Sequence, residues 1–322
     1  MYARKYCQTG GYLAALSENR KSEHAKANLP ASAWGNADGI RMKLPESALN
    51  KSVLVVAHPD DEVLWFSSIL NEIDKIIIVF LDAGHSPELG KSRQRGIDEH
   101  EFRDRITLLN LAQTRSHNRS AWPEPEETEF GLRLTSDPEH ECLYQDQGLR
   151  VRAALDTHIQ GASNVFTHNP WGEYGHEDHV QIHRITTQLA RSTNSTVWYG
   201  SYVSNKSSML MQSYMQVFDN SYYTMPVDRD RAKQIADTYF RNNAWTWPDD
   251  YAWFPSESFI QGPLERQQQP CAGAFFPVNY LRVPFDPETA NAPPPGPITR
   301  IRRKLRRLLI ANKKHPTDAA TD

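Results

Sequence analysis

The sequence predicts an α/β fold in which a mainly parallel β-sheet is flanked by helices. Short apolar runs rich in β-branched residues occur at 52–57, 75–81, 163–167 and 196–200, and such runs are typical of strands buried on both faces of a sheet. Segments of helical character lie between or after them, at 62–73, 93–111, 148–160, 178–192 and 228–242. Strands that alternate with helices indicate parallel crossover connections.

The composition of the chain divides it into a long central domain and two unlike ends. We expect a partly ordered leader over 1–50, the main domain over 51–283, a linker over 284–297 and a basic tail over 298–322. The linker is predicted because its segment is rich in proline. Within the main domain, residues 122–145 are acidic and contain prolines, so we predict a long loop there.

Charge is distributed unevenly along the chain. The formal net charge is −3, but residues 298–315 hold eight Lys or Arg and no acid. Without residues 298–322 the chain has 28 basic and 37 acidic residues, a formal charge of −9. An acidic body is unsuited to nucleic acid, so we expect no nucleic-acid partner.

The basic tail carries an apolar stripe. Its apolar residues recur three or four positions apart, at Ile298, Ile301, Leu305, Leu308 and Leu309, which predicts an amphipathic cationic helix. Such a helix suits the surface of an anionic membrane, the partner we expect for residues 298–314. The alternatives are docking on the acidic body of the protein and an oligomer contact.

The N-terminus and the cysteines indicate a cytoplasmic protein. Residues 1–20 lack a continuous apolar run of signal-peptide length, and no run approaches the length of a membrane span. Cys7, Cys142 and Cys271 are far apart and odd in number, which predicts reduced thiols. With the basic tail, the predicted location is cytoplasmic, including the inner face of the membrane.

The first candidate motif, Ala57-His-Pro-Asp-Asp-Glu62, directly follows the first strand. Sites in such folds form at the carboxyl ends of strands, and a divalent cation would relieve the repulsion between the adjacent carboxylates. His58 and Asp61 are three residues apart, so one helical turn can bring both to one metal. Asp60 then stays off the metal and can take a proton from the attacking water. The plainer alternative is an Asp helix cap.

A second motif, Gly175-His-Glu-Asp-His179, follows the 163–167 strand through a Gly-rich turn. Both motifs leave strands, so they can meet at one edge of the sheet. His179 would then complete a set of three ligands and leave one position open, which is the pattern of catalytic rather than structural zinc sites.

Other polar residues of this motif have candidate roles beside the metal. His176 is placed to stabilise a developing oxyanion or to protonate the leaving nitrogen. Asp178 is a candidate for orienting an imidazole from behind. For His183, on the same helical face as His179, we favour a purely structural role, and His168 is similarly ambiguous.

An aromatic segment over 244–254 contains Trp245 and Trp247. It could be a stacking platform for sugar rings or part of the packing of C-terminal helices against the sheet, and the sequence favours neither.

The two motifs together resemble the LmbE-like, or PIG-L, family of N-acetylglucosaminyl de-N-acetylases. The family pattern is Ala-His-Pro-Asp-Asp-Glu with a later Gly-His-x-Asp-His, and both parts are intact at 57–62 and 175–179. The resemblance covers roughly residues 52–260 and implies a Rossmann-like fold. It also implies one zinc ion per chain, or another divalent ion, held by His58, Asp61 and His179.

The same resemblance implies roles for the remaining site residues. Asp60 is implied as general base and His176 as the group that stabilises the tetrahedral intermediate. Family members commonly carry a substrate-binding arginine on the helix after the second strand, and three residues, Arg93, Arg95 and Arg103, are candidates for that position here.

We therefore expect a zinc-dependent amidohydrolase that deacetylates an N-acetylhexosamine in a glycolipid, a nucleotide sugar or a precursor in surface-polysaccharide biosynthesis. One alternative is a deacylase of a small-molecule glycoside or another linear amide. Another is a non-catalytic sugar- or metal-binding module, against which Asp60 argues because a module that only holds zinc does not need it.

Overall fold

The computed structural model describes residues 42–83, 86–214, 222–265 and 278–285. The predictions for the first 41 residues and for the basic tail lie outside the described residues, as does most of the predicted proline-rich linker.

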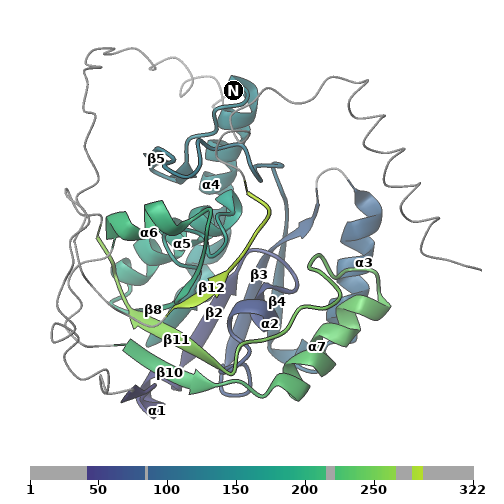
Figure 1. The fold of residues 1–322 in the computed structure, drawn as a ribbon. Coiled ribbons are helices and arrows are strands. Elements are labelled where there is room, and N and C mark those ends of the chain that lie inside the picture. The colour runs from purple at the N-terminus through teal and green to yellow at the C-terminus, as the bar shows by residue number, and fades with distance from the viewer. Residues whose placement is uncertain (1–41, 84–85, 215–221, 266–277, 286–322) are drawn as a thin grey trace, which may run out of the picture. The chain divides into compact units, whose positions relative to one another are not determined.

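An eight-stranded mixed sheet forms the centre of the fold (Figure 1). In spatial order its strands are β1 (Met42–Lys43), β10 (Tyr222–Pro226), β11 (Ser256–Gln261), β8 (Thr196–Gly200), β7 (Asn164–Thr167), β2 (Ser52–Val56), β3 (Lys75–Asp82) and β4 (Ile106–Ala112). The strands from β8 to β4 are parallel, whereas β11 is antiparallel to both of its neighbours. The mainly parallel sheet predicted from the sequence is confirmed.

Helices cover both faces of this sheet (Figure 1). α4 (Pro138–Ile159) and α5 (Glu177–Ser192) lie on one face, and α2 (Asp61–Trp65), α3 (Pro87–Asp98) and α7 (Arg229–Arg241) lie on the other. In β2, Val53 and Val55 pack with the first group, while Leu54 and Val56 pack with the second. Successive side chains of a strand point to opposite faces, so burial on both faces explains the continuous apolar runs.

Smaller elements complete the described part. They are α1 (Glu46–Leu49), α6 (Ser208–Tyr214), a 3-10 helix (Arg103–Arg105), the parallel pair β9 (Tyr202–Ser204) with β12 (Asn279–Leu281), and the hairpin β5 (Glu127–Thr128) with β6 (Gly131–Leu132). β1 and α1 belong to the segment expected as leader, and β1 pairs in parallel with β10 at the edge of the large sheet.

The helix predicted over 62–73 is much shorter in the structure, where α2 ends at Trp65. A longer helix would need the carbonyl of Val63 for the N–H of Ser67. That carbonyl instead accepts the indole N–H of Trp253 at 2.7 Å. The hydroxyls of Ser67 and Ser68 meanwhile donate to the buried carboxylate of Glu257.

The helix predicted over 93–111 is wrong in its second half. α3 begins earlier, where Ser86 caps its N-terminus by accepting the N–H of Leu89, and it ends at Asp98. Residues 106–112 form β4, the edge strand that pairs with β3. Pairing with a neighbouring strand outweighs the helical propensity of the leucines there.

The loop predicted over 122–145 is also partly wrong. It contains the β5–β6 hairpin and the start of α4, which begins after Asp137 accepts the N–H of Glu139 at 2.9 Å. The helix predicted over 148–160 is therefore the second part of a 22-residue helix.

Cys142 lies on α4 and is disulfide-bonded. The prediction of reduced thiols is wrong at this residue. The prediction of a cytoplasmic location thereby loses the support of the cysteines, because disulfides persist mainly in oxidising compartments. No helix in the described part of the chain is long and apolar enough to cross a membrane.

Candidate metal centre and cavity

The two sequence motifs meet at the carboxyl ends of the neighbouring strands β2 and β7. These strands pair in parallel, with Val55 opposite Thr167. The turn after β2 provides His58 and Asp61, and the first turn of α5 provides His179. One potential ligand atom from each of these three buried residues lies within 4.8 Å of the other two. The structure thus places the three predicted metal ligands together.

The turn after β2 has a tight backbone conformation. The N–H of His58 donates to Asp61 Oδ2 at 2.7 Å, and the N–H of Asp61 donates to the carbonyl of His58 at 3.2 Å. Asp60 between them has φ of 103°, in the left-handed region that non-glycine residues rarely occupy. Its N–H donates to Glu62 Oε2 at 3.1 Å. Strained backbone of this kind persists where surrounding contacts fix it.

A chain of hydrogen bonds fixes the protonation of His179. The N–H of Ala57 donates to Nε2 of His168 at 2.9 Å, so Nε2 is an acceptor and the proton of the ring is on Nδ1, 3.0 Å from Glu173 Oε2. This contact opposes a second proton on the ring. Burial opposes it too, although Glu173 and Asp61 outweigh burial and raise the pKa of His168 to about 9. Nδ1 of His179 donates to the same carboxylate oxygen at 2.7 Å. Nε2 of His179 therefore carries a lone pair. It lies 3.3 Å from Asp61 Oδ1 and has no hydrogen-bond partner among the described residues.

Glu173 is suited to accept both protons because it is ionised. Burial opposes ionisation, but the neighbouring rings of His168 and His179 lower the pKa of Glu173 to about 2. Its second oxygen accepts the N–H of Asn169 at 3.0 Å. The carboxylate therefore holds both imidazoles with their Nδ1 protons directed toward it.

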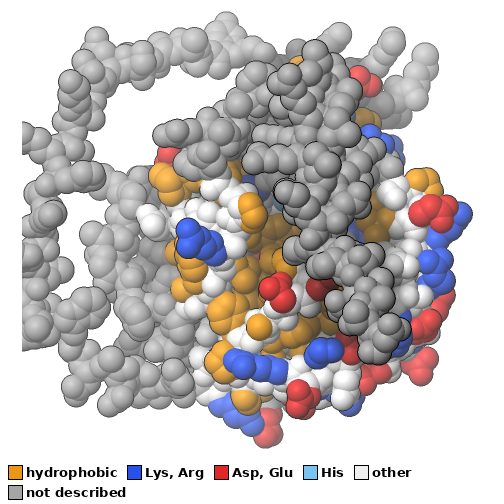
Figure 2. Space-filling model, turned by 45° about the vertical axis from the view of Figure 1, so that its right-hand side comes forward, with side chains coloured by type: hydrophobic (Ala, Val, Ile, Leu, Met, Phe, Trp, Pro, Cys, Tyr) orange, Lys and Arg blue, Asp and Glu red, His pale blue; other side chains and the backbone are white. Residues whose placement is uncertain are grey.

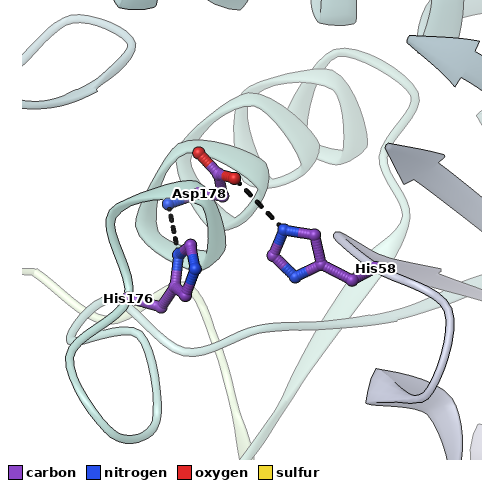
Figure 3. A group of neighbouring side chains, drawn as sticks. All are labelled: His58, His176 and Asp178. Atoms are coloured by element: carbon purple, nitrogen blue, oxygen red, sulfur yellow. Dashed lines mark hydrogen bonds and ion pairs between the residues drawn. The ribbon is translucent and has the colours of Figure 1, made fainter. Parts of the chain in front are cut away.

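His58 is fixed in a corresponding way by Asp178. Nε2 of His58 donates to Asp178 Oδ2 at 3.1 Å (Figure 3). Ser116 and Gln113 also donate to this carboxylate. Burial disfavours its charge, yet these hydrogen bonds lower the pKa of Asp178. Burial opposes the charged ring, but Asp61 and Asp178 raise the pKa of His58. In the neutral ring that a metal ligand requires, Nδ1 carries a lone pair 3.2 Å from Asp61 Oδ2.

This arrangement of protons fits a divalent cation. When His58 and His179 are neutral, their lone pairs face the two oxygens of Asp61 at 3.2 and 3.3 Å. Burial works against ionisation of Asp61, but its neighbours His179 and His58 hold its pKa well below the usual range, and Trp65 Nε1 donates to Oδ1 at 2.9 Å. Lone pairs that face one another in a dry site repel unless a cation lies between them. Imidazole nitrogen and carboxylate oxygen are ligands that zinc prefers.

His176 is held beside this centre as a neutral hydrogen-bond donor. It is the N-cap of α5, and its Nδ1 accepts the N–H of Asp178 at 3.0 Å (Figure 3). Burial, followed by the nearby rings of His117 and His179, keeps the pKa of His176 well below its usual value. The neutral ring must then carry its proton on Nε2. The ring of His117 stacks on it with centroids 4.5 Å apart.

A cavity of about 460 Å³ opens beside these residues. Among the predicted site residues, those that line it are His58, Asp60, Asp61, Asp178, His176, Arg93 and Trp247. His179 is fully buried and is not part of the lining.

Figure 2 turns the α3 and α7 side of the molecule forward, and hydrophobic side chains gather around the middle of that face.

The three candidate arginines differ in their position relative to the cavity. Arg93 is only 4% exposed and lines the cavity, where Nη1 donates to Gln113 and Nε has no hydrogen-bond partner among the described residues. Arg95 donates to Ser92, and Arg103 forms an ion pair with Asp98 at 3.6 Å. The structure places neither Arg95 nor Arg103 in the cavity lining.

Of the two roles predicted for the aromatic segment, one residue suits contact with a sugar and another contributes to packing. Trp247 lines the cavity and packs edge-on against Trp65 and Tyr174, with centroids 5.1 and 5.0 Å away. Trp245 instead stacks on Phe240 at 5.0 Å and lines a separate hollow. Of the two predicted tryptophans, only Trp247 lines the cavity beside the two sequence motifs.

Several residues of the site were not predicted. Glu173 is part of the turn before the second motif, and Thr246 donates to Asp60 from a segment far along the chain. Lys206 lines the cavity and donates to the carbonyl of Gly175 and to Asn118. Glu173 could have been noticed as an acid beside the motif, whereas Thr246 and Lys206 carry no local signal.

Comparison with known proteins agrees with the two motifs. The family model for PIG-L, described as GlcNAc-PI de-N-acetylase, matches residues 53–190. A curated relative from Corynebacterium diphtheriae, 1D-myo-inositol 2-acetamido-2-deoxy-alpha-D-glucopyranoside deacetylase, is 24% identical over 157 residues. The match covers 44% of this chain and 53% of the relative, so the chain spans about half the length of that protein.

Two solved structures are similar to this chain over part of its length. N,N'-diacetylchitobiose deacetylase from Pyrococcus horikoshii is 16% identical, with a TM-score of 0.37 over 62% of this chain and 72% of that chain. The A40926 pseudoaglycone deacetylase Dbv21 is 15% identical, with a TM-score of 0.39 over 68% of this chain and 98% of that chain. Both motifs lie within residues 53–190, the part of the chain that matches the PIG-L family model.

Proposed function

We propose that this protein is a zinc-dependent hydrolase that removes the acetyl group from the nitrogen of an N-acetylhexosamine. The observation that carries the proposal is the cluster of His58, Asp61 and His179, whose ligand atoms lie within 4.8 Å of one another beside a cavity lined by Asp60 and His176. The family match supports deacetylation as the reaction.

Zinc would be held by His58, Asp61 and His179. When bound, it would supply a Lewis acid that polarises the amide carbonyl and lowers the pKa of water, as in other sites with three protein ligands and an open position. Another divalent ion would suit the same ligand set.

Asp60 is the proposed general base. Burial and the adjacent Asp61 raise the pKa of Asp60 to about 8, against the opposing effects of Arg93 and Thr246. A proton acceptor works best when its pKa is near the working pH. In the proposed reaction Asp60 takes a proton from the attacking water and returns it to the nitrogen as the C–N bond breaks.

His176 is the proposed donor to the developing oxyanion. Its Nδ1 is occupied by the N–H of Asp178, so only the Nε2 proton is available for a substrate. A donor fixed in a buried site stabilises the negative charge that forms on the carbonyl oxygen. Asp178 has a second role, because its carboxylate orients His58.

The cavity has room for a sugar and a neighbouring group. Its volume of about 460 Å³ lies within the usual range for ligand sites. Trp247 and Tyr174 offer aromatic surface to the C–H face of a pyranose, and Arg93 offers a buried cation in the cavity wall. We propose that the substrate sugar belongs to a glycolipid, a nucleotide sugar or a surface-polysaccharide precursor.

The decisive experiment is to measure acetate release by the purified, zinc-loaded protein. The panel comprises N-acetylglucosamine, UDP-linked N-acetylhexosamines and N-acetylated glycolipids. Release from any of them supports the proposed reaction, and the preferred substrate identifies the class. Absence of release from all of them, with zinc bound, would contradict the proposal and favour another amide substrate or a binding module.

We also propose that the basic tail associates with anionic membrane surfaces. The proposal rests on the charge and apolar pattern of residues 298–314. Each basic residue near such a surface contributes roughly 1 kcal/mol. The fraction of protein that sediments with anionic liposomes should therefore fall when residues 298–322 are deleted. Equal fractions for the full-length and the truncated protein would contradict the proposal.

A further inference from the structure

Thr246 holds one oxygen of Asp60 through two hydrogen bonds. Its hydroxyl donates to Asp60 Oδ2 at 2.7 Å, and its backbone N–H donates to the same oxygen at 3.3 Å. Among the described residues, no other group donates to this carboxylate. The two residues are 186 positions apart, and Thr246 lies outside the region that matches the family model.

This contact leaves the two carboxylate oxygens of Asp60 in different situations. Oδ2 is occupied by both donors of Thr246, so Oδ1 is the oxygen that is available to a reacting water. Asp60 and Thr246 both line the cavity. Proton transfer depends on the orientation of the acceptor, so a group that fixes the carboxylate has a direct effect on the rate.

Thr246 is itself held firmly, because both of its neighbours are packed. On one side Trp245 stacks on Phe240 with centroids 5.0 Å apart. On the other side Trp247 packs against Trp65 and Tyr174. The exposed threonine between them therefore presents its hydroxyl from a fixed backbone.

The end of α7 also supports the backbone of Asp60. The hydroxyl of Tyr239 donates to Glu62 Oε1 at 2.6 Å, and Glu62 Oε2 accepts the N–H of Asp60. The N–H of Ala244 in turn donates to the carbonyl of Tyr239 at 2.8 Å. The same C-terminal segment thus holds the backbone of Asp60 through Glu62 and its side chain through Thr246.

We propose that Thr246 is a positioning residue for Asp60. The inference rests on the proposed function, in which Asp60 is the general base. Thr246 determines which carboxylate oxygen faces the reacting water and restricts rotation of the carboxylate. A purely structural threonine would affect the stability of the segment and leave the turnover of the folded enzyme unchanged.

The test compares Thr246→Val, which removes the hydroxyl and keeps the branched shape, with Thr246→Ser, which restores the hydroxyl. kcat and KM for acetate release are measured on the preferred substrate. We expect Thr246→Val to lower kcat by about 10- to 100-fold with little change in KM, since misplacing a reacting group by about 1 Å can cost this much. Thr246→Ser should recover most of the turnover.

Thr135→Val is the matched control. Thr135 is also exposed, and its hydroxyl makes one hydrogen bond, to the carbonyl of Arg119 at 3.1 Å, away from the cavity. This variant should keep the wild-type kcat. A Thr246→Val enzyme with wild-type kcat, or a Thr246→Ser enzyme as slow as Thr246→Val, would overturn the inference.

Crystal structures of the wild type and of Thr246→Val separate this inference from the proposed function. If the wild type releases no acetate, the proposed function fails, and the positioning of Asp60 is judged from the structures alone. A carboxylate that turns in Thr246→Val supports the inference. An unchanged orientation of Asp60 overturns it, whether or not the wild type is active.

Discussion

His179 donates its Nδ1 proton to Glu173 over 2.7 Å, and this contact determines which nitrogen of His179 faces Asp61. His168 donates to the same carboxylate oxygen. A fully buried carboxylate that accepts from two imidazoles fixes both of their tautomers, and such partners of metal-binding histidines tune the affinity for the metal.

Replacing Glu173 with glutamine should weaken zinc binding by about 10- to 100-fold. The amide has one acceptor oxygen. If this oxygen takes the place of Oε2, the NH₂ group opposes the backbone N–H of Asn169, and in the reverse orientation it opposes both imidazole N–H groups. Competition with a chromogenic chelator measures the affinity. Glu257→Gln is the control, because Glu257 is equally buried but is bonded to Ser67, Ser68 and Tyr202. Wild-type affinity in Glu173→Gln would contradict this role of the carboxylate.

Asp60→Asn should lower turnover by about 100- to 10,000-fold, the usual contribution of a general base. Zinc should be retained, because Asp60 is not among the three clustered ligand residues. Acetate release and the metal content of the purified variant are the two measurements. Unchanged turnover would refute the assignment of the base, and loss of the metal would show that Asp60 is instead a ligand.

Removal of the cation should abolish acetate release and lower the melting temperature. Without it, no cation joins the ligand nitrogens of His58 and His179 to the oxygens of Asp61, which lie 3.2 and 3.3 Å away in a buried site. Zinc at 100 times its Kd should stabilise the fold by about 2.7 kcal/mol. Thermal unfolding is followed in chelator and then during stepwise return of zinc. In Asp61→Asn the zinc-dependent rise should be absent, and a rise equal to that of the wild type would exclude Asp61 as a ligand.

Trp247→Ala should raise KM by about two- to tenfold, which corresponds to the roughly 0.5–1.5 kcal/mol of an aromatic contact. Trp247 lines the cavity, whereas Trp245 does not. Trp245→Ala is a matched control because it removes a large aromatic side chain from the same segment. Equal effects of the two substitutions on KM would show that the segment acts through its general packing and not through contact with the substrate.

The central strands of the sheet could be predicted because each is recognisable from its own residues. β2, β3, β7 and β8 are buried on both faces, so each is a continuous apolar run. β4 is only partly buried at the sheet edge, and its leucines resemble a helix. β10 and β11 were not predicted, because they depend on antiparallel pairing with each other and with β8.

The site could be predicted only where the spacing of residues is local. His58 and Asp61 share one turn after β2, and His179 lies in the first turn of α5, so the strand ends bring them together. The partners that hold these residues come from elsewhere. Thr246 contacts Asp60 across 186 positions, and nothing in the residues around Thr246 indicates that contact.

The adjacency of β2 and β7 makes the centre a product of long-range folding. Ala57 and His168, which are hydrogen-bonded across this strand pair, are 111 positions apart, and contacts of such sequence separation form slowly. A nascent chain that has not yet reached residue 179 holds only part of the ligand set, so the cation can stabilise the protein only after the central strands have paired. Zinc would therefore bind late in folding and stabilise the folded state, and it would not nucleate folding.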